Sequence, residues 1–495
     1  MGAALTPTCL LGALPLDILF AILCWLDGKT ITRCCSVCRL WRETIATSTE
    51  LQYSVELWAD GLIPGDADGL SPVEKMERLN ERRRRWRDLD WTSRTVFPIN
   101  QQPRAYELVG GVFAQQNTWP QSDFAAIRLP TAQTGGHVTV TENIGVESLD
   151  FAMDPSRDLV IFLHKHPDEI GNLDCRSLSS LRPHPQASVP RLSFDLRDDE
   201  FRRIFVQIAG DVVGLLFRTT GSLRLVLFNW CTGAPLVDLA GPQFPHSVSD
   251  FSLLSPQAYI LAAVNDSQYY RGQPKGIGEI HIYSFDETQR SYPTLVATLQ
   301  LPHPNPGRFL DRIIAHSGPF CAYPLPGPFS QSNDNRIMVI SLAYDRSEYY
   351  SVYMHHRYLK KYLHPTNDGP PPKIMWDEWG PQNSRMLPGR HLFWLRYVHG
   401  ERVVCPVDPA HPRRVELLDF GVTPTRPGFD ASPPMIIEAS TISQEGSVFK
   451  QDVVTALPYR RCCRELNDDH ILYLVDQDRI LGVTEMVNKL IVYTF

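Results

Sequence analysis

The N-terminal stretch LPLDILFAILCWLDGKTITRCCSVCRLWR, residues 14–42, carries apolar side chains at helical spacing. Pro15 suits the first turn of a helix, and Asp17 places a negative charge where the helix dipole favours it. Two apolar rows run along this predicted helix, Ile18, Ile22 and Trp25 in one and Leu16, Leu19, Leu23 and Leu26 in the other. A helical domain of about 40 residues is too small to bury both rows. We therefore expect one row to contact a partner surface.

A second helical pattern follows after a short break. Asp27 and Gly28 predict the end of the first helix, and Thr30 is expected to cap the next one. The apolar positions of the second pattern are Ile31, Cys34, Cys35, Val37, Cys38, Trp41 and Ile45. The N-terminal region is thus predicted to be a small bundle of two or three helices.

These residues together resemble an F-box. The family pattern has Leu-Pro followed by an acidic residue and aliphatic pairs, and it closes on Val-Cys, a basic residue and Trp; all of these occur here in the expected spacing. Thr30-Ile31-Thr32 replaces the usual leucine-rich start of the second helix. The resemblance implies docking on the Skp-family adaptor of a cullin–RING ubiquitin ligase. It places the following residues on or behind the adaptor-facing surface: Leu14, Pro15, Ile18, Leu19, Ile22, Leu23, Leu26, Val37, Cys38 and Trp41.

Each of these residues taken singly is also explained by packing in a local helical core. The assembled pattern favours the adaptor, because the second apolar row needs a partner.

The chain divides into three regions of different composition. Residues 10–58 are predicted to be the F-box domain, residues 59–98 a linker with a charged helix at 71–91, and residues 99–495 a large β domain. Ser71, Pro72 and Glu74 form a capping box at the start of the charged helix, whose expected apolar stripe includes Val73, Met76, Leu79 and Trp86. Its basic run, Arg82–Arg85 with Arg87, resembles a nuclear signal or nucleic-acid patch. A solvated face paired with Glu77 and Glu81 is the favoured interpretation.

The β region contains apolar strand candidates in pairs that recur about every 50 residues. The pairs are 148–151 with 159–163, 205–208 with 212–216, and 251–254 with 259–262. Two further strands follow each of the last two pairs, and four short strands at this period are typical of a β-propeller blade. We therefore predict an α plus all-β fold with a propeller-like domain of six to eight blades. It is similar to the C-terminal domains of large fungal F-box families; a β-sandwich or several unrelated β modules are the alternatives.

Known repeat signatures are sparse in this region. Trp376-Asp377 is a lone WD dipeptide, and residues 106–111 resemble one kelch strand with its double glycine. The proline-containing segment 364–389 is expected to be a long loop between strands. Exposed loop aromatics are candidate binding hot spots, namely Tyr269, Tyr270, Trp376 and Trp379.

Motifs of catalysis and ligand binding are weak. Gly28-Lys29-Thr30 imitates the end of a P-loop but follows a helix, and Cys35 with Cys38 lacks a second ligand pair. His164, His166 and Asp168 lack a fourth metal ligand nearby. The sequence therefore predicts no catalytic residue, no metal and no cofactor. An enzyme or ligand-binding propeller, whose N-terminal helices only pack locally, and an F-box scaffold without a degradative role remain the alternatives.

Composition limits the classes of partner and compartment. The 495 residues include 48 basic and 55 acidic side chains, a net charge of −7, which argues against a binder that relies on a broad basic surface. The 11 scattered cysteines favour reduced thiols in the cytoplasm or nucleus. No segment predicts a stable membrane span. Met1-Gly2 with Thr6 fits the loose myristoylation pattern.

Overall fold

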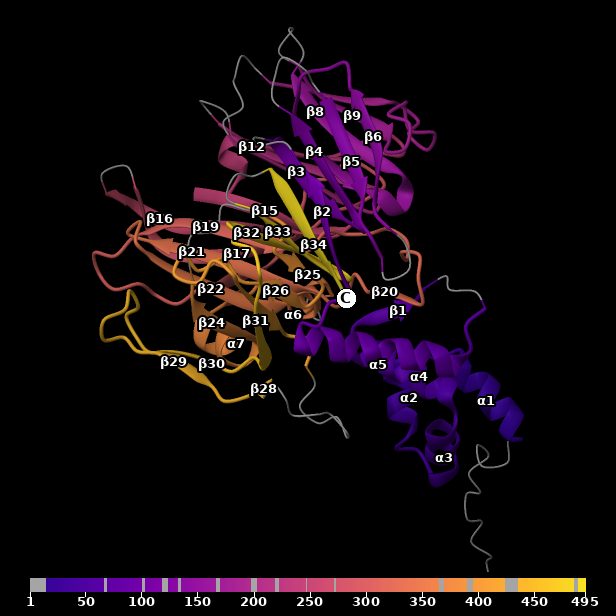
Figure 1. Cartoon of the computed structure of the whole chain (residues 1–495). Coiled ribbons are helices and arrows are strands. Elements are labelled where there is room, and N and C mark those ends of the chain that lie inside the picture. Colours follow the sequence, from indigo (N-terminus) through magenta and orange to yellow (C-terminus); the bar gives the residue numbers. More distant parts are fainter. Residues whose placement is uncertain are drawn as a thin grey trace, which may run out of the picture. The chain divides into compact units, whose positions relative to one another are not determined.

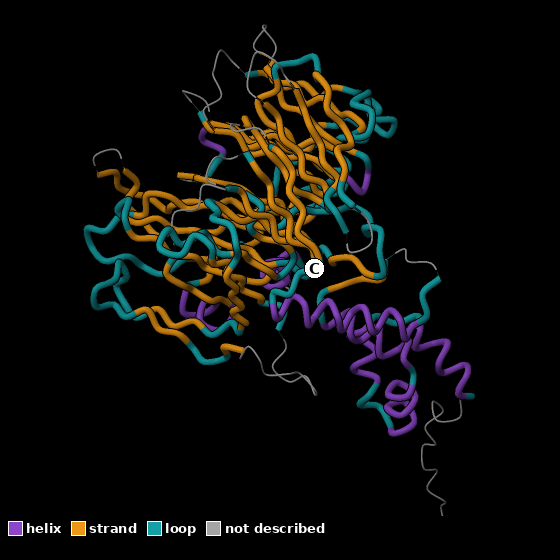
Figure 2. Tube along the Cα trace, viewed as in Figure 1, coloured by secondary structure: helices purple, strands orange, loops and turns teal. Residues whose placement is uncertain are grey.

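The computed structural model describes residues 15–65, 69–99, 103–117, 123–131, 135–165, 170–196, 203–218, 222–245, 247–270, 273–364, 369–389, 395–422, 435–484 and 488–495. These residues form two compact units. The first contains the described residues up to Trp86 together with Pro324–Ser332, and the second contains Arg87–Tyr323 and Asn333–Phe495. Helices make up most of the first unit, and strands make up most of the second (Figure 2).

The first unit is built from five helices among its described residues. They are α1 (Leu16–Cys24), α2 (Gly28–Cys34), α3 (Arg39–Thr47), α4 (Thr49–Ala59) and α5 (Pro72–Asp88), the last of which runs two residues past the boundary of the unit. The core of α1–α4 is apolar and comprises Leu19, Leu23, Ile31, Cys34, Ile45 and Leu51. The expected small helical domain is therefore present (Figure 1).

The cap between α1 and α2 differs from the expectation. Asp27, not Thr30, is the N-cap of α2, and its side chain accepts a hydrogen bond from the Thr30 backbone N–H at 2.8 Å. Gly28 is the first residue of α2, and a Cβ there would collide with the carbonyl oxygen of Ser54 and with Trp58. The glycine therefore serves the close approach of α2 to α4 rather than the end of α1.

A distant segment completes the first unit. Strand β1 (Leu62–Pro64) pairs antiparallel with β20 (Phe329–Gln331). The Tyr53 hydroxyl donates a hydrogen bond to the Pro328 carbonyl oxygen at 2.9 Å. The Phe329 ring is buried with side chains from α4, β1 and α5, which are Tyr53, Leu57, Leu62 and Leu79. Residues far apart in the sequence thus share one apolar cluster.

The charged helix α5 begins with the predicted capping box. The Ser71 backbone N–H donates to the Glu74 carboxylate at 2.8 Å, and the Glu74 N–H donates to Ser71 Oγ at 3.3 Å. Its basic side chains have carboxylate partners: Arg83 binds Asp60 at 2.6 Å, and Arg84 and Arg85 both bind Glu81. Leu79 and Trp86 of the expected stripe are buried, whereas Val73 is exposed.

The second unit is a seven-bladed β-propeller. Seven of the sheets formed by its described strands have a four-stranded meander as their main part, and one further pair of short strands forms a separate sheet. The strands of the first three blades are β3 (Pro103–Val109), β4 (Val112–Asn117), β5 (Asp123–Arg128), β6 (His137–Asn143), β7 (Ser148–Asp154), β8 (Leu159–Lys165), β9 (Ile170–Ser177), β10 (Arg191–Asp195), β11 (Arg203–Ala209), β12 (Val212–Arg218), β13 (Leu223–Asn229) and β14 (Pro235–Ala240). The three strand pairs that the sequence predicts are therefore the first two strands of the second, third and fourth blades.

The fourth and fifth blades carry additional elements. Their strands are β15 (Ser247–Ser255), β16 (Ala258–Tyr270), β17 (Gln273–Ser284), β18 (Thr294–Gln300), β19 (Leu310–Ser317), β21 (Ile337–Tyr344), β22 (Glu348–His355) and β24 (Ser384–Pro388). Strand β23 (Lys373–Ile374) adds to β18 in parallel, and helices α6 (His356–Lys360) and α7 (Trp376–Asn383) lie between β22 and β24 in the chain.

The last two blades bring the two ends of the propeller chain together. Their strands are β25 (Val398–His399), β26 (Arg402–Val404), β27 (Arg414–Asp419), β31 (Tyr459–Glu465), β32 (Leu472–Asp476), β33 (Arg479–Val483), β34 (Lys489–Thr494) and, from the start of the domain, β2 (Ser93–Pro98). Shorter strands are β28 (Met435–Ile436), which pairs with β31, and the pair β29 (Ser440–Ile442) and β30 (Val453–Thr455). Because β2 is the outermost strand of the seventh blade, we draw the domain boundary before residue 93 rather than at 99.

The seven blades form a closed ring. The first strand of each blade contacts the first strands of its two neighbours, in the order β3, β7, β11, β15, β19, β25, β32 and back to β3. The ring is reinforced by β2, which pairs over its whole length with β34. A closed ring leaves each sheet only short edges exposed, which is how propellers limit edge-to-edge pairing.

Packing between blades explains the apolar runs in the sequence. Strands β8 and β12 are buried at six consecutive positions, because each blade packs against a neighbour on both of its faces. Polar side chains of the inner strands also bridge the blades. Gln207 accepts from the Leu253 N–H, Asp250 from the Ala315 N–H and Asp476 from the Gly111 N–H, each at 2.8–2.9 Å.

Segment 364–389 is not simply a loop, in contrast to the expectation. Residues 376–383 form α7, whose N-terminus is capped by Glu378 through the Met375 N–H at 3.0 Å. Trp376 and Trp379 are buried in the core shared by the fourth and fifth blades, and Trp379 Nε1 donates to the Gln300 carbonyl oxygen at 2.8 Å. They are therefore not exposed hot spots; the side chains of Tyr269 and Tyr270, the other candidates, lie outside the described residues.

Candidate functional site

Helix α1 is apolar on two faces, but only one of them is buried. Leu19 and Leu23 have no exposed surface and belong to the helical core. Ile18 is 51% exposed, Ile22 44% and Trp25 90%. These three residues follow each other at spacings of four and three, so they lie along one side of the helix. The sequence predicts that one row is buried and the other left uncovered, and the structure shows that the uncovered row is the one with Ile18, Ile22 and Trp25.

The turn between α2 and α3 adds exposed residues to the same unit. Val37 is 51% exposed, and Cys38, the N-cap residue of α3, is also exposed. The Val37 N–H donates to the Cys34 carbonyl oxygen at 3.1 Å, which closes the turn. Large aliphatic side chains are seldom left uncovered without a binding role when several occur in so small a domain.

The structure separates the ten residues named from the F-box resemblance into two groups. Pro15, Ile18, Ile22, Val37 and Cys38 are exposed, whereas Leu19 and Leu23 are buried and Leu26 and Trp41 are half-buried against the core. Leu14 lies outside the described residues. Trp25 is the most exposed of the large apolar residues and was not among the ten, although its spacing from Ile18 and Ile22 marked it.

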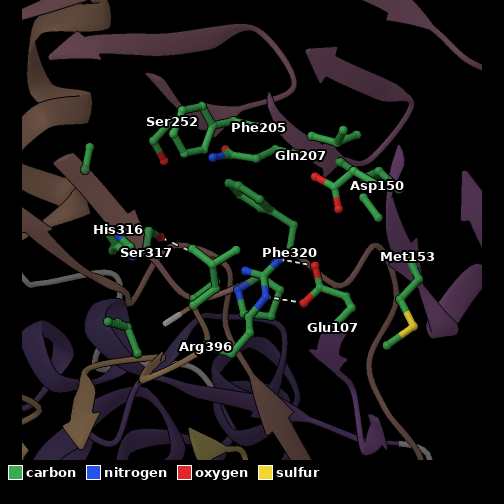
Figure 3. Close-up of a pocket in the computed structure, with 18 of the residues that line it drawn as sticks. Glu107, Asp150, Met153, Phe205, Gln207, Ser252, His316, Ser317, Phe320 and Arg396 are labelled. Carbon is green, nitrogen blue, oxygen red and sulfur yellow. Dashed lines mark hydrogen bonds and ion pairs between the residues drawn. The ribbon is translucent and has the colours of Figure 1, made fainter. Parts of the chain in front are cut away.

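A second candidate site is the central cavity of the propeller, with a volume of about 90 Å³. Its lining comes from the inner strands of several blades and from the segments next to them (Figure 3). The Arg396 and Glu107 side chains point toward one another in this cavity and form an ion pair with two contacts. Burial lowers the pKa of Arg396, but the Glu107 carboxylate outweighs it, so that the pKa is raised overall.

Two other titratable side chains in the cavity have altered proton affinities. Burial raises the pKa of Asp150 to about 7; the hydrogen bond from the Phe151 N–H lowers it, while the negative charge of Glu107 raises it further. Burial, with the positive charge of Arg396 as a second cause, lowers the pKa of His316 to about 4. The imidazole is therefore neutral at neutral pH, and the Asp150 carboxyl is about half protonated there.

Other features noted in the sequence do not assemble into a site. His164 is buried and lies 3.2 Å from Asp174, while His166 and Asp168 fall outside the described residues. Within the described ranges, no group of three or more His, Cys, Asp or Glu side chains is arranged to hold a metal ion. Met1, Gly2 and Thr6, the myristoylation pattern, also lie outside them. A helix of the length and hydropathy needed to cross a membrane is likewise absent from the described part of the chain.

One family model matches the N-terminal part of the chain. Residues 11–54 match the family described as F-box-like. No curated protein sequence matches the chain.

Several solved structures are similar to most of the chain, but only distantly. One is BamB from Moraxella catarrhalis, 10% identical, with 81% of this chain and 98% of that chain covered and a TM-score of 0.34. Another is the Cps50 (Swd1) β-propeller domain of Myceliophteria thermophila, 7% identical, with 81% and 100% covered and a TM-score of 0.39. The assignment of the fold rests on strand pairing rather than on these likenesses. The protein is an F-box-like domain followed by a seven-bladed β-propeller.

Proposed function

We propose that this protein is the substrate-recognition subunit of an SCF-type ubiquitin ligase. In this role its F-box-like domain binds a Skp-family adaptor, and its propeller binds a substrate protein. The chain itself performs no covalent chemistry. It holds a substrate lysine close to the ubiquitin-conjugating enzyme, which raises the effective concentration of the reacting groups. We place this work in the cytoplasm or nucleus.

The observation that carries the proposal is the uncovered apolar row of α1. Ile18, Ile22 and Trp25 lie beside the core face of a helix in an F-box-like domain, and exposed Val37 belongs to the same unit. Burial of such side chains on a partner is favourable by about 1.5–3 kcal/mol for each large aliphatic residue.

Co-purification with a Skp-family adaptor tests the proposal. The double variant Ile18→Asp/Ile22→Asp places two charges on the exposed row without touching Leu19 or Leu23 in the core. We expect the intact chain to capture the adaptor and the double variant to bind it at least about 30-fold more weakly. The measurement is the dissociation constant by surface plasmon resonance with the full-length protein.

Val73→Asp is the matched control, because Val73 is also an exposed aliphatic residue of the first unit but lies on α5. It should bind the adaptor as the unchanged protein does. Equal weakening by both variants, or no capture by the unchanged chain, would contradict the proposal. A reconstituted ligase reaction then separates a degradative receptor from a scaffold, since a scaffold would bind the adaptor without supporting transfer of ubiquitin to a bound protein.

A further inference from the structure

The central cavity of the propeller contains an arginine whose charge is not balanced by any described carboxylate. Arg336 lines the cavity immediately before β21, and only 3% of its surface is exposed. Its Nη2 donates a hydrogen bond to Ser317 Oγ at 2.5 Å. Among the described residues, Nε and Nη1 have no hydrogen-bond partner although both atoms are buried.

A comparison within the same domain shows that this arrangement is unusual. Arg385 of β24 is also fully buried, but each of its three side-chain nitrogens donates a hydrogen bond: Nε binds the Leu457 carbonyl oxygen at 2.8 Å, and Nη1 and Nη2 bind the Glu438 carbonyl oxygen at 3.1 Å. Arg396, in the same cavity as Arg336, is paired with Glu107. Arg336 has neither a carboxylate nor a full set of carbonyl acceptors.

The surroundings of Arg336 disfavour an uncompensated charge. The Phe320 ring lies against the guanidinium, 3.7 Å from its carbon to the ring centroid, and holds the plane of the group in place. Burial, together with the like charge of Arg396, lowers the pKa of Arg336 to about 9. The group nevertheless remains protonated at neutral pH, so a positive charge with two unused donors is kept inside the protein.

The carboxylates that share the cavity are engaged elsewhere. Glu107 binds Arg396, and Asp250 accepts from the backbone N–H groups of Phe251 and Ala315, both at 2.9 Å. The remaining one, Asp150, is partly protonated at neutral pH because burial raises its pKa. The cavity has a volume of about 90 Å³, whereas one water needs about 10–15 Å³. The cavity that Arg336 lines thus has room for a group larger than one water.

We infer that the central cavity of the propeller binds a small oxyanion, a carboxylate or a phosphate group, on the Arg336 guanidinium. Ordered water could fill the two unused donor positions, but water does not neutralise the charge, whereas an oxyanion does both. Arginine is suited to this because its planar group donates several hydrogen bonds in fixed directions to oxyanions. The ligand site is separate from the F-box-like domain and does not depend on adaptor binding.

Titration of the full-length protein with two separate probes, inorganic phosphate and acetate, tests the inference at constant ionic strength maintained with chloride. We expect a saturable rise in the unfolding temperature with at least one probe, because a ligand that binds only the folded state stabilises it. For phosphate, equilibrium dialysis with the radiolabelled ion should then give one ion per chain; for acetate, the labelled acid is used in the same way.

Two variants connect the binding to Arg336. Arg336→Met keeps the length of the side chain without its charge and should abolish the saturable response. Arg336→Lys keeps the positive charge but lacks the planar set of donors, so it should bind the oxyanion at least about tenfold more weakly. It replaces the methionine variant in the test if that variant does not fold. Arg290→Gln is the control, because Arg290 is an exposed arginine of the same unit, 3.7 Å from Asp238; it should respond as the unchanged protein does.

The inference fails if neither probe gives a saturable response in the unchanged protein, since water alone would then occupy the two donors. It also fails if the Arg336 variant that folds responds with the same affinity as the unchanged protein, because binding would then lie elsewhere.

Discussion

At the scale of single residues, two buried carboxyls show how neighbours set proton affinity. Burial alone would raise the pKa of Asp174, but hydrogen bonds from His164, Arg191 and Arg176 outweigh it and lower the pKa. Among the described residues no cation lies within hydrogen-bonding distance of Asp150, which accepts from the Phe151 N–H at 2.9 Å. Its pKa is accordingly raised by burial to about 7.

Asp150→Asn should stabilise the protein in a pH-dependent way. In the folded state the Asp150 carboxyl keeps its proton up to about pH 7, whereas in the unfolded chain it loses the proton near pH 4. The folded state therefore binds more protons in this window, and the contribution of Asp150 to stability falls as the pH rises from about 4 to about 7. Asparagine has no charge to bury and can still accept from the Phe151 N–H.

The free energy of unfolding, measured in urea for both proteins at pH 4, 6 and 8, checks this. We expect no difference at pH 4 and a gain for Asp150→Asn of up to about 4 kcal/mol at pH 8. Asp250→Asn is the contrast, because both Asp250 carboxylate oxygens accept backbone hydrogen bonds. A gain for Asp150→Asn that is the same at all three pH values would contradict the assignment.

At the scale of elements, β20 is the segment whose role the local sequence does not indicate. It lies in the chain between β19 and β21 of the fifth blade, yet it pairs with β1 and places Phe329 in the cluster of the helical unit. The Arg82 guanidinium also lies over the Phe329 ring, 5.6 Å from its centroid. The first unit therefore contains a strand and a buried ring that its N-terminal sequence does not supply.

Phe329→Ala should destabilise the helical unit by about 3–4 kcal/mol, because it removes a buried aromatic ring and leaves a cavity. The expected readout is faster amide hydrogen exchange in α4 and α5, with exchange in β8 and β12 unchanged. Tyr292→Ala removes an exposed aromatic side chain, 68% exposed, and serves as the control. Unchanged exchange in α4 and α5 would show that β20 is not required there.

At the scale of the whole molecule, the propeller is closed by its first and last strands. Strand β2 pairs with β34 from Ser93 with Thr494 to Pro98 with Lys489. The Ile99 N–H donates to the Asn488 carbonyl oxygen at 3.1 Å, in the same register. Because inward and outward N–H groups alternate along an antiparallel strand, the N–H of Thr95 faces β34 and that of Val96 faces away.

Two proline variants of β2 test whether this pairing closes the ring. Thr95→Pro removes an inward N–H and should lower the free energy of unfolding of the propeller by about 3 kcal/mol. Val96→Pro, one residue further on, should cost much less, because its N–H has no partner strand. Urea unfolding with hydrogen exchange in β33 and β34 measures both; equal effects of the two variants would contradict the strand register or its role in closure.

The sequence by itself determined the elements whose pattern is local. The two apolar rows of α1, the Ser71–Glu74 capping box and the strand pairs of the second to fourth blades all rest on periodicities of a few residues, so composition and spacing were enough. The number of blades was predicted only as a range, because β23, α7 and the segment containing β20 interrupt the period in the fifth blade. The sequence likewise predicts that α1 has two apolar rows and that one of them is exposed. It does not tell which of the two rows is buried in the core.

Only the tertiary structure decided the features that join distant residues. Phe329 completes the helical unit from the middle of the propeller chain, and Trp376 and Trp379 are buried although a proline-rich segment precedes them. The cavity brings Asp150, Arg336 and Arg396 together from different blades. The burial of a side chain and the balance of its charge depend on which segments of the chain are in contact in the folded protein. A single sequence shows only which residues are neighbours along the chain. For the same reason nothing in the sequence distinguishes Arg336 from the other arginines, whereas the structure shows that its buried Nε and Nη1 have no hydrogen-bond partner among the described residues.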